Sequence, residues 1–246
     1  MKAVILAAGY ATRLYPLTLD RPKALLPVGG KPMLDHLMAQ LEGIDGLDEV
    51  YVVTNTKFAE AFGEWEAERE GGLPVEIVDD GTTDEDSRLG AIGDLDFTIR
   101  ETSLDDDLLV LAGDNLFSES VAGFPQFALA KGGPALGVYD VGDLDAIRRY
   151  SAIELDEDDR VTKLEEKPER PRSTLAGIAL YLYPRAALGF VREYLEAGNN
   201  PDQPGRLVQW LYPRTPVYGW RVPGRWFDVG SKETLAEADE AFTAPG

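Results

Sequence analysis

The sequence predicts an α/β protein of three layers, in which helices cover both faces of a mixed, mainly parallel sheet. Three observations lead to this prediction. Short apolar segments alternate with segments of helical periodicity through the first half of the chain, strand-like segments dominate the second half, and glycine or polar residues follow several strands directly. The 246 residues are 44% hydrophobic, which is enough for a sizeable core.

The first half reads as strand and helix in turn. A short apolar segment follows Lys2, and a helix begins near Pro32 because Met33, Leu37 and Leu41 recur at helical spacing. Val50, Val52 and their neighbours form a buried strand. The predicted elements are strands at 2–7, 49–54, 75–78 and 108–112 and helices at 32–41, 58–69 and 90–100.

The second half has strands with few helices between them, which is typical of a mixed or antiparallel extension of a sheet. We expect strands at 135–141, 151–156, 160–166, 178–183 and 217–222 and helices at 186–195, 206–212 and 232–242. No internal repeat and no linker interrupts the pattern. The chain is therefore expected to be a single domain, 1–246, with halves at 1–134 and 135–246.

The composition excludes several kinds of protein. The chain has no cysteine and one histidine, so disulfides, thiolate chemistry and histidine-rich metal sites are not expected. Its formal net charge is −20, which argues against binding to nucleic acid or to anionic membranes. No apolar stretch approaches the roughly 20 residues that span a bilayer, and we expect a cytoplasmic protein.

The acidic residues gather in stretches. Those at 45–49, 79–86, 105–107 and 154–159 are expected in turns or on exposed faces. An ordinary acidic surface explains this pattern, and so does adaptation to high salt, where screening makes dense carboxylates tolerable.

A loop after the first strand carries the strongest functional pattern. Leu6, Ala7, Ala8 and Gly9 are small or apolar at the carboxyl end of that strand, where open α/β sheets bind nucleotides. Arg13 and, further along, Lys23 add positive charge suited to a triphosphate. The loop has neither the Gly-Lys-Ser/Thr of a P-loop nor the three spaced glycines of a dinucleotide fingerprint.

Two aspartates stand at strand ends. Asp114 follows the apolar strand at 108–112, and Asp228 lies in Trp-Phe-Asp-Val-Gly between a strand-like segment and a helix. Carboxylate oxygens together with water and phosphate are the ligands that Mg²⁺ prefers. A further motif, Glu165-Glu166-Lys167-Pro168, places acid, base and a chain stop at the end of another strand.

These motifs together resemble the nucleotidyltransferases that act on sugar 1-phosphates, the glucose-1-phosphate thymidylyltransferase and uridylyltransferase group. The resemblance is carried by Leu-Ala-Ala-Gly with Arg13, by Arg21-Pro22-Lys23 and by Gly-Asp-Asn at 113–115, together with Trp-x-Asp-x-Gly at 226–230 and Glu-Lys-Pro at 166–168. It implies a Rossmann-like nucleotide-diphospho-sugar transferase fold, a nucleoside triphosphate and a sugar 1-phosphate as substrates, and Mg²⁺ as cofactor.

The resemblance also implies a role for each matching residue. Arg13, Lys23 and Lys167 would be catalytic, and Asp114 and Asp228 would bind the metal. The nucleotide would be bound by Leu6, Ala7, Ala8, Gly9, Thr12 and Gly90, and the sugar phosphate by Asn115, Tyr150, Ser151, Glu166 and Lys167.

Three departures from the family pattern concern specificity. Ala11 stands where the commonest pattern has glycine, Ser151 stands where relatives often have glycine after tyrosine, and the stretch at 175–181 lacks the usual threonine-glycine pair. The stretch 79–83 also lacks the glutamine-rich pattern of thymidylyltransferases, although Leu89-Gly90-Ala91 resembles the segment that packs on the base. The base therefore remains open among thymine, uracil and cytosine, with dTTP or UTP favoured, and the acceptor sugar is open.

The expected reaction is attack by the acceptor phosphate on the α-phosphorus of the triphosphate, with release of pyrophosphate. A phosphate monoester needs no general base, which agrees with the near absence of histidine. One alternative is cytidylyl transfer to phosphocholine or an inositol phosphate, with Trp210, Tyr218, Trp220 and Trp226 as aromatic walls. Another is a nucleotide-binding homologue that has lost turnover.

The family resemblance also bears on the size of the protein. The last predicted helix ends close to residue 246, so we expect neither a left-handed helix repeat nor the additional C-terminal helices of a regulatory site. The sequence does not indicate an oligomeric state.

Overall fold

The structure is a computed structural model that describes residues 1–243. A central sheet begins with four parallel strands, β1 (Lys2–Leu6), β4 (Glu49–Thr54), β5 (Val75–Asp79) and β6 (Leu108–Ala112). Strand β1 lies between β4 and β6, with Leu6 opposite Ala112 in the register. The carboxyl ends of β1 and β6 therefore meet at one edge of the sheet.

The second half of the chain extends the same sheet. Its strands are β8 (Ala135–Asp140), β9 (Ser151–Leu155), β10 (Val161–Glu166), β11 (Leu175–Tyr183) and β12 (Tyr218–Arg221). Strand β11 is antiparallel to β6 and joins the two halves. On the side of β11 away from β6, β9 and then β10 continue the sheet. Since one sheet crosses position 134, we propose that both halves belong to a single domain.

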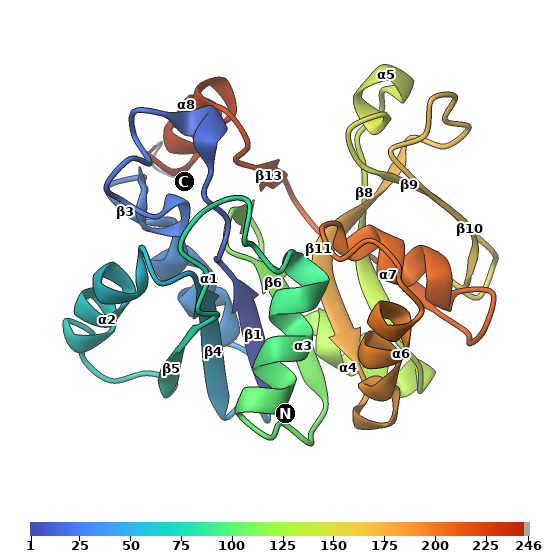
Figure 1. Cartoon of the computed structure of the whole chain (residues 1–246). Coiled ribbons are helices and arrows are strands. Elements are labelled where there is room, and N and C mark those ends of the chain that lie inside the picture. Colours follow the sequence, from blue (N-terminus) through green and yellow to red (C-terminus); the bar gives the residue numbers. More distant parts are fainter. Residues whose placement is uncertain (244–246) are drawn as a thin grey trace.

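Helices cover both faces of the sheet, as the alternation of buried side chains requires. Ala3 and Ile5 face the helices α1 (Met33–Leu41), α2 (Ala59–Ala67) and α4 (Gly123–Lys131). Val4 faces the opposite side, which is covered by α3 (Ala91–Glu101), α6 (Gly189–Glu196) and α7 (Pro204–Leu211). Figure 1 shows α3, α6 and α7 on the near side of the sheet.

A small ribbon brings the end of the chain back to the carboxyl edge of the sheet. Strands β7 (Asn115–Phe117) and β13 (Trp226–Asp228) are antiparallel, with Asn115 opposite Asp228. The last helix, α8 (Lys232–Thr243), packs its buried Ala238 in a cluster with Leu116 and Phe227. The remaining elements are β2 (Pro27–Val28), β3 (Lys31–Pro32), α5 (Leu144–Ile147) and short 3₁₀ turns at Thr12–Leu14, Lys23–Leu25 and Arg185–Ala187.

The predicted fold class is confirmed, and most predicted elements lie within a few residues of the observed ones. Two differences have local causes. Helix α4 was not predicted because Gly123 and Pro125 are residues that usually mark a loop, yet the proline lies in the first turn, where its missing N–H costs nothing. The helix expected at 186–195 begins at Gly189, after the 3₁₀ turn at Arg185–Ala187. Within the described residues, no helix combines the length and apolar character needed to cross a membrane.

Candidate functional site

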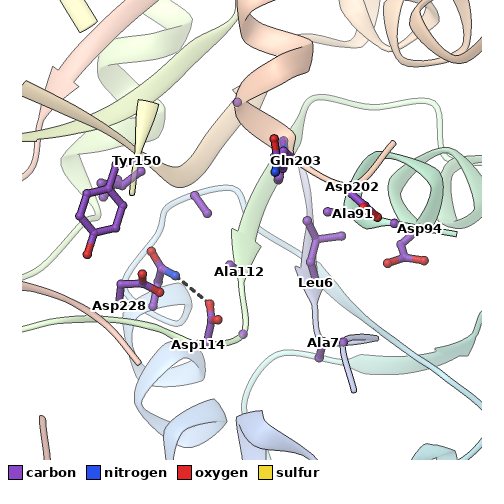
Figure 2. Close-up of a pocket in the computed structure, with 18 of the residues that line it drawn as sticks. Leu6, Ala7, Ala91, Asp94, Ala112, Asp114, Tyr150, Asp202, Gln203 and Asp228 are labelled. Atoms are coloured by element: carbon purple, nitrogen blue, oxygen red, sulfur yellow. Dashed lines mark hydrogen bonds between the residues drawn. The ribbon is translucent and has the colours of Figure 1, made fainter. Parts of the chain in front are cut away.

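A cavity of about 550 Å³ opens at the carboxyl edge of the sheet, where β1 and β6 end. Segments from both halves line it: the loop after β1, the start of α3, the ends of β6 and β10, the start of α7 and strand β13. Figure 2 shows Asp114, Asp228 and Tyr150 at one end and Ala91, Asp94 and Asp202 at the other, with Leu6 and Ala112 between them. This is the position at which open α/β sheets bind their ligands.

One end of the cavity is lined by the residues predicted to bind the nucleotide. Leu6, Ala7, Ala8 and Gly9 line it after β1, and Gly90 lines it at the start of α3. The backbone here is fixed because Ala7 N–H donates to the Val53 carbonyl at 2.9 Å and Gly113 N–H donates to the Leu6 carbonyl at 2.9 Å. Arg13 also lines the cavity and is exposed. Thr12 lies in the same 3₁₀ turn but is exposed and is not among the lining residues.

The residue before that turn has an unusual backbone. Ala11 has φ 49° and ψ 41°, in the left-handed region that favours glycine. Its carbonyl accepts a hydrogen bond from the buried Thr18 hydroxyl at 2.8 Å, which holds the conformation. The glycine of the commonest family pattern is therefore explained by the backbone at this position, and alanine adopts the same turn with some strain.

Lys23 and Asp114 form an ion pair beside the end of β6. The Lys23 ammonium lies 2.5 Å from Asp114 Oδ2, and the Asn115 side-chain amide donates to Asp114 Oδ1 at 2.8 Å (Figure 2). Burial alone would raise the pKa of the Asp114 carboxyl, but Lys23 and Asn115 hold it below its usual range. Asp114 is therefore a fixed carboxylate.

Asn115 serves mainly to connect its neighbours. Its side chain donates to Asp114 and accepts from the Trp226 indole N–H at 2.6 Å, and Asn115 is buried. Trp226 in turn packs edge-on against Tyr150, with 5.1 Å between the ring centroids. Asn115 was predicted to bind the sugar phosphate. Asn115 lines the cavity, and we propose that it also orients Asp114 and Trp226, because its side chain is bonded to both.

Asp228 faces Asp114 across the pairing of β7 and β13. Burial first, and the charge of Asp114 second, raise the pKa of Asp228 to about 6. Lys23 is bonded to Asp114, so the second carboxylate lacks a bonded cation of its own among the described residues.

This pair of carboxylates fits a divalent cation. Two acidic oxygen donors with one excess negative charge suit Mg²⁺, which commonly takes one or two carboxylates and completes its shell with water and phosphate. Within residues 1–243, no three acidic or histidine side chains gather around a common point. Asp114 and Asp228 would therefore bind such an ion together with substrate oxygens.

The five residues predicted to bind the sugar phosphate all line the cavity, and one of them is Asn115. The other four are Tyr150, Ser151, Glu166 and Lys167. Lys167 has φ 47°, and its N–H donates to the Tyr150 carbonyl at 2.9 Å, so the turn that follows β10 sets the position of this cation. The structure therefore brings the segments that carry these predicted residues to one cavity. Of the four aromatic residues considered for a cation-binding wall, Trp226 lines the cavity, whereas Trp210, Tyr218 and Trp220 do not.

Sequence reasoning missed a bridge between the halves. Arg88 donates from Nε and Nη2 to the two carboxylate oxygens of Asp202 at 3.2 and 3.1 Å, and Ile92 N–H donates to the Pro201 carbonyl at 2.8 Å. Arg88 lines the cavity. So do Asp202 and the neighbouring Gln203, which Figure 2 shows. No pattern along the chain could have found this contact, because its partners lie more than a hundred residues apart.

A buried acid pair was also missed. Asp80 and Asp94 are 6% and 7% exposed, and each has one carboxylate oxygen without a hydrogen-bond partner among the described residues. Burial and the neighbouring Asp80 raise the pKa of Asp94 to about 8, so Asp94 carries a proton at neutral pH. The expectation that the stretch 79–86 is exposed or in turns is wrong for Asp80, because Asp80 N–H donates to the Thr54 carbonyl at 2.8 Å and draws the residue inward.

Comparison with known proteins gives a consistent result. The family model for nucleotidyl transferases matches residues 2–244. The UTP–glucose-1-phosphate uridylyltransferase AglF of Haloferax volcanii is 30% identical over 98% of this chain and 96% of its own length. The glucose-1-phosphate thymidylyltransferase of Neisseria meningitidis is 29% identical over 97% of this chain and 81% of its own length.

Two further similarities extend the comparison. The bifunctional protein GlmU of Methanocaldococcus jannaschii is 25% identical over 98% of this chain, which spans 54% of the length of that protein. A solved structure of UDP-glucose pyrophosphorylase complexed with UDP-glucose has a TM-score of 0.82 at 19% identity, covering 98% of this chain and 97% of that one. This structural match supports the fold.

Proposed function

This chain belongs to the nucleotidyl transferase family, and we propose that it transfers a nucleoside monophosphate from a nucleoside triphosphate to a sugar 1-phosphate. The products would be a nucleoside diphosphate sugar and pyrophosphate. The observation that carries the proposal is the convergence of Arg13, Lys23, Asp114, Lys167 and Asp228 on one cavity, although they come from five separate segments.

The geometry suits a reaction between two anions. An oxygen of the acceptor phosphate would attack the α-phosphorus, and the bond from that phosphorus to the bridging oxygen of pyrophosphate would break. The nucleophile is already ionised at neutral pH, so no general base is required. Catalysis then depends on placing the two phosphates together and offsetting their charge.

Each cation would act at a different point. Lys23, held against Asp114, would lie beside the α-phosphate, and Lys167 at the end of β10 would bind the acceptor phosphate. The exposed Arg13 would hold the departing pyrophosphate. When bound by Asp114 and Asp228, Mg²⁺ would supply further charge neutralisation at the phosphates.

We propose that dTTP or UTP is the nucleotide. A uridylyltransferase and a thymidylyltransferase are among the similar proteins of nearly matching length, which supports a pyrimidine base. Cytidylyl transfer to a non-sugar phosphate receives less support, because three of the four aromatic residues that it would need lie outside the cavity.

We also propose that the protein acts in the cytoplasm, where nucleoside triphosphates are made, and at high salt. The net charge of −20 supports the second point. Neither point bears on the assignment of the reaction.

The decisive experiment is a panel of triphosphates against acceptors with Mg²⁺, read out as pyrophosphate release. The triphosphates are dTTP, UTP, CTP, ATP and GTP, and the acceptors are glucose, galactose, mannose and glucosamine 1-phosphates, phosphocholine and an inositol phosphate. We expect turnover with a sugar 1-phosphate and a pyrimidine triphosphate. Turnover with phosphocholine or the inositol phosphate alone would favour the alternative enzyme, and nucleotide binding without pyrophosphate release would indicate a silent homologue.

A further inference from the structure

The acceptor end of the cavity contains a carboxylate that is held on one side. Ser151, the first residue of β9, is buried, and its hydroxyl donates a short hydrogen bond to Glu166 Oε2 at the end of β10. The Glu166 N–H also donates to the Gln209 side-chain oxygen at 3.1 Å, which ties this strand end to α7. Both the backbone and the carboxylate of Glu166 are thereby fixed.

Helix α7 closes on the same carboxylate oxygen. Its second residue, Gly205, is buried, and a Cβ added to it would lie against Glu166 Oε2 and the Ser151 hydroxyl, closer than real Cβ atoms approach. The first turn of this helix carries a partial positive charge, which favours a carboxylate nearby. A glycine is therefore required here by close approach, although its backbone is helical.

The two oxygens of Glu166 differ as a result. Oε2 is engaged by Ser151 and covered by Gly205, whereas Oε1 makes no hydrogen bond within the part of the chain that the structure describes. A free carboxylate can accept hydroxyl groups on both oxygens. In the structure, only Oε1 of Glu166 is without a protein partner among the described residues.

We propose that Ser151 and Gly205 are positioning residues for Glu166, and that they leave Oε1 as the single oxygen that accepts a hydroxyl group of the acceptor. This inference rests on the proposed function, because it assumes that a sugar phosphate occupies this end of the cavity. This arrangement favours an acceptor that presents one hydroxyl to Glu166. Ser151 was predicted to bind the sugar phosphate, and the proposal instead has it orient Glu166.

The first test compares two glycine-to-alanine variants. Gly205→Ala pushes a methyl group into the Ser151–Glu166 pair, whereas Gly63→Ala in α2 adds a methyl group with no atom within 4 Å. Alanine favours a helical backbone more than glycine does, so both variants should fold. With the acceptor that performs best in the panel, we expect Gly205→Ala to raise the acceptor KM about tenfold or more, with the triphosphate KM within about twofold of wild type. Gly63→Ala should match wild type.

The second test removes the hydroxyl. Ser151→Ala should raise the acceptor KM by about tenfold with a smaller change in kcat, and Ser151→Thr, which keeps the hydroxyl, should restore most of the affinity. Deoxy analogues of the acceptor then identify the hydroxyl involved. With the full acceptor, Glu166→Gln should raise the acceptor KM relative to wild type. With the one analogue that lacks the hydroxyl facing Oε1, the two proteins should have the same KM.

The outcomes separate this inference from the proposed function. If Gly205→Ala and Ser151→Ala bind the acceptor as wild type does, or if two different deoxy analogues each cancel the effect of Glu166→Gln, the positioning role is wrong while the reaction stands. If wild type transfers to no sugar phosphate, the proposed function is wrong. The positioning role is then wrong as well, because it assumes that acceptor.

Discussion

At the scale of single residues, each cation of the site is placed by a different local feature. Lys23 contacts Asp114, Lys167 is set by the turn after β10, and Arg13 extends from a turn whose first residue is strained. The residues proposed as catalytic can therefore be tested one at a time.

The first prediction concerns two of these residues. Asp114→Ala and Lys167→Ala should each reduce kcat by about 10²- to 10³-fold. Lys167→Ala removes a cation beside the acceptor phosphate, and Asp114→Ala removes a ligand of the proposed divalent cation. Pyrophosphate release measures the loss, and circular dichroism checks that the fold is intact. Lys57→Ala, an exposed lysine outside the cavity, is the control. Near-normal turnover in either variant would contradict the role assigned to it.

The second prediction concerns the buried acid pair. The pKa of Asp94 is about 8 in the folded protein against about 3.8 for an ordinary aspartate, so the folded state holds the proton more tightly. Stability should be greatest below pH 4 with respect to this group and should fall as pH rises from about 4 to about 8. Asp94→Asn, which carries N–H donors at every pH, should remove this dependence.

The measurement is the free energy of unfolding in urea between pH 5 and pH 9. We expect Asp94→Asn to be more stable than wild type at pH 8, by about 5 kcal/mol at most. The exposed Asp45→Asn should follow the wild-type curve. Parallel curves for wild type and Asp94→Asn would show that Asp94 is ionised in the folded protein.

The third prediction concerns the backbone at Ala11. A left-handed φ costs an alanine about 1 kcal/mol, which glycine avoids. Part of that gain is offset, because glycine has more conformational freedom in the unfolded chain. Ala11→Gly should therefore raise the free energy of unfolding by roughly 0.5 kcal/mol. Ala236→Gly, at an exposed right-handed position inside α8, should lower it. Equal destabilisation of both variants would argue against strain at residue 11.

At the scale of elements, the two halves meet through the starts of α3 and α7. The Arg88–Asp202 pair and the bond from Ile92 N–H to the Pro201 carbonyl lie beside Gly90, where an added Cβ would meet the Pro201 carbonyl at 2.8 Å. These contacts hold the nucleotide end of the cavity against the segment that leads to Gly205.

The fourth prediction tests this bridge. A double-mutant cycle of Arg88→Ala and Asp202→Ala should give a coupling energy of about 0.5 to 1 kcal/mol in low salt, since both side chains are partly exposed. The coupling should shrink in molar KCl, because ions screen the pair. Urea unfolding gives the four free energies. A coupling that does not change with salt would show that the contact depends on packing instead.

At the scale of the whole molecule, the charge of −20 sets the response to salt. Repulsion among surface carboxylates falls as ions are added. As a fifth prediction, the melting temperature should rise between 0.1 M and 2 M KCl. The same series in a variant with several exposed aspartates of 79–86 other than Asp80 changed to asparagine should show a smaller rise. A fall or a flat profile in wild type would remove the proposal of high-salt adaptation.

Much of this architecture could be predicted from the chain. Periodicity placed β4 and β6 with their observed bounds, because strands buried on both faces are continuously apolar. It did not place α4, whose glycine and proline resemble a loop, or strands β7 and β13, whose three residues each carry too little pattern. The predicted site residues lie around one cavity, apart from Thr12.

By itself, the sequence determined the three-layer class, the strand ends that bear Asp114 and Gly9, and the family to which the motifs belong. Local order along the chain is sufficient for these, because a strand end, a turn and a motif each depend on neighbouring residues. The tertiary structure decided that Ser151 holds Glu166 under Gly205, that Asp80 and Asp94 are buried together, and that Arg88 reaches Asp202. Such contacts depend on how distant segments pack, and their energies arise from burial and close approach that appear once the chain has folded.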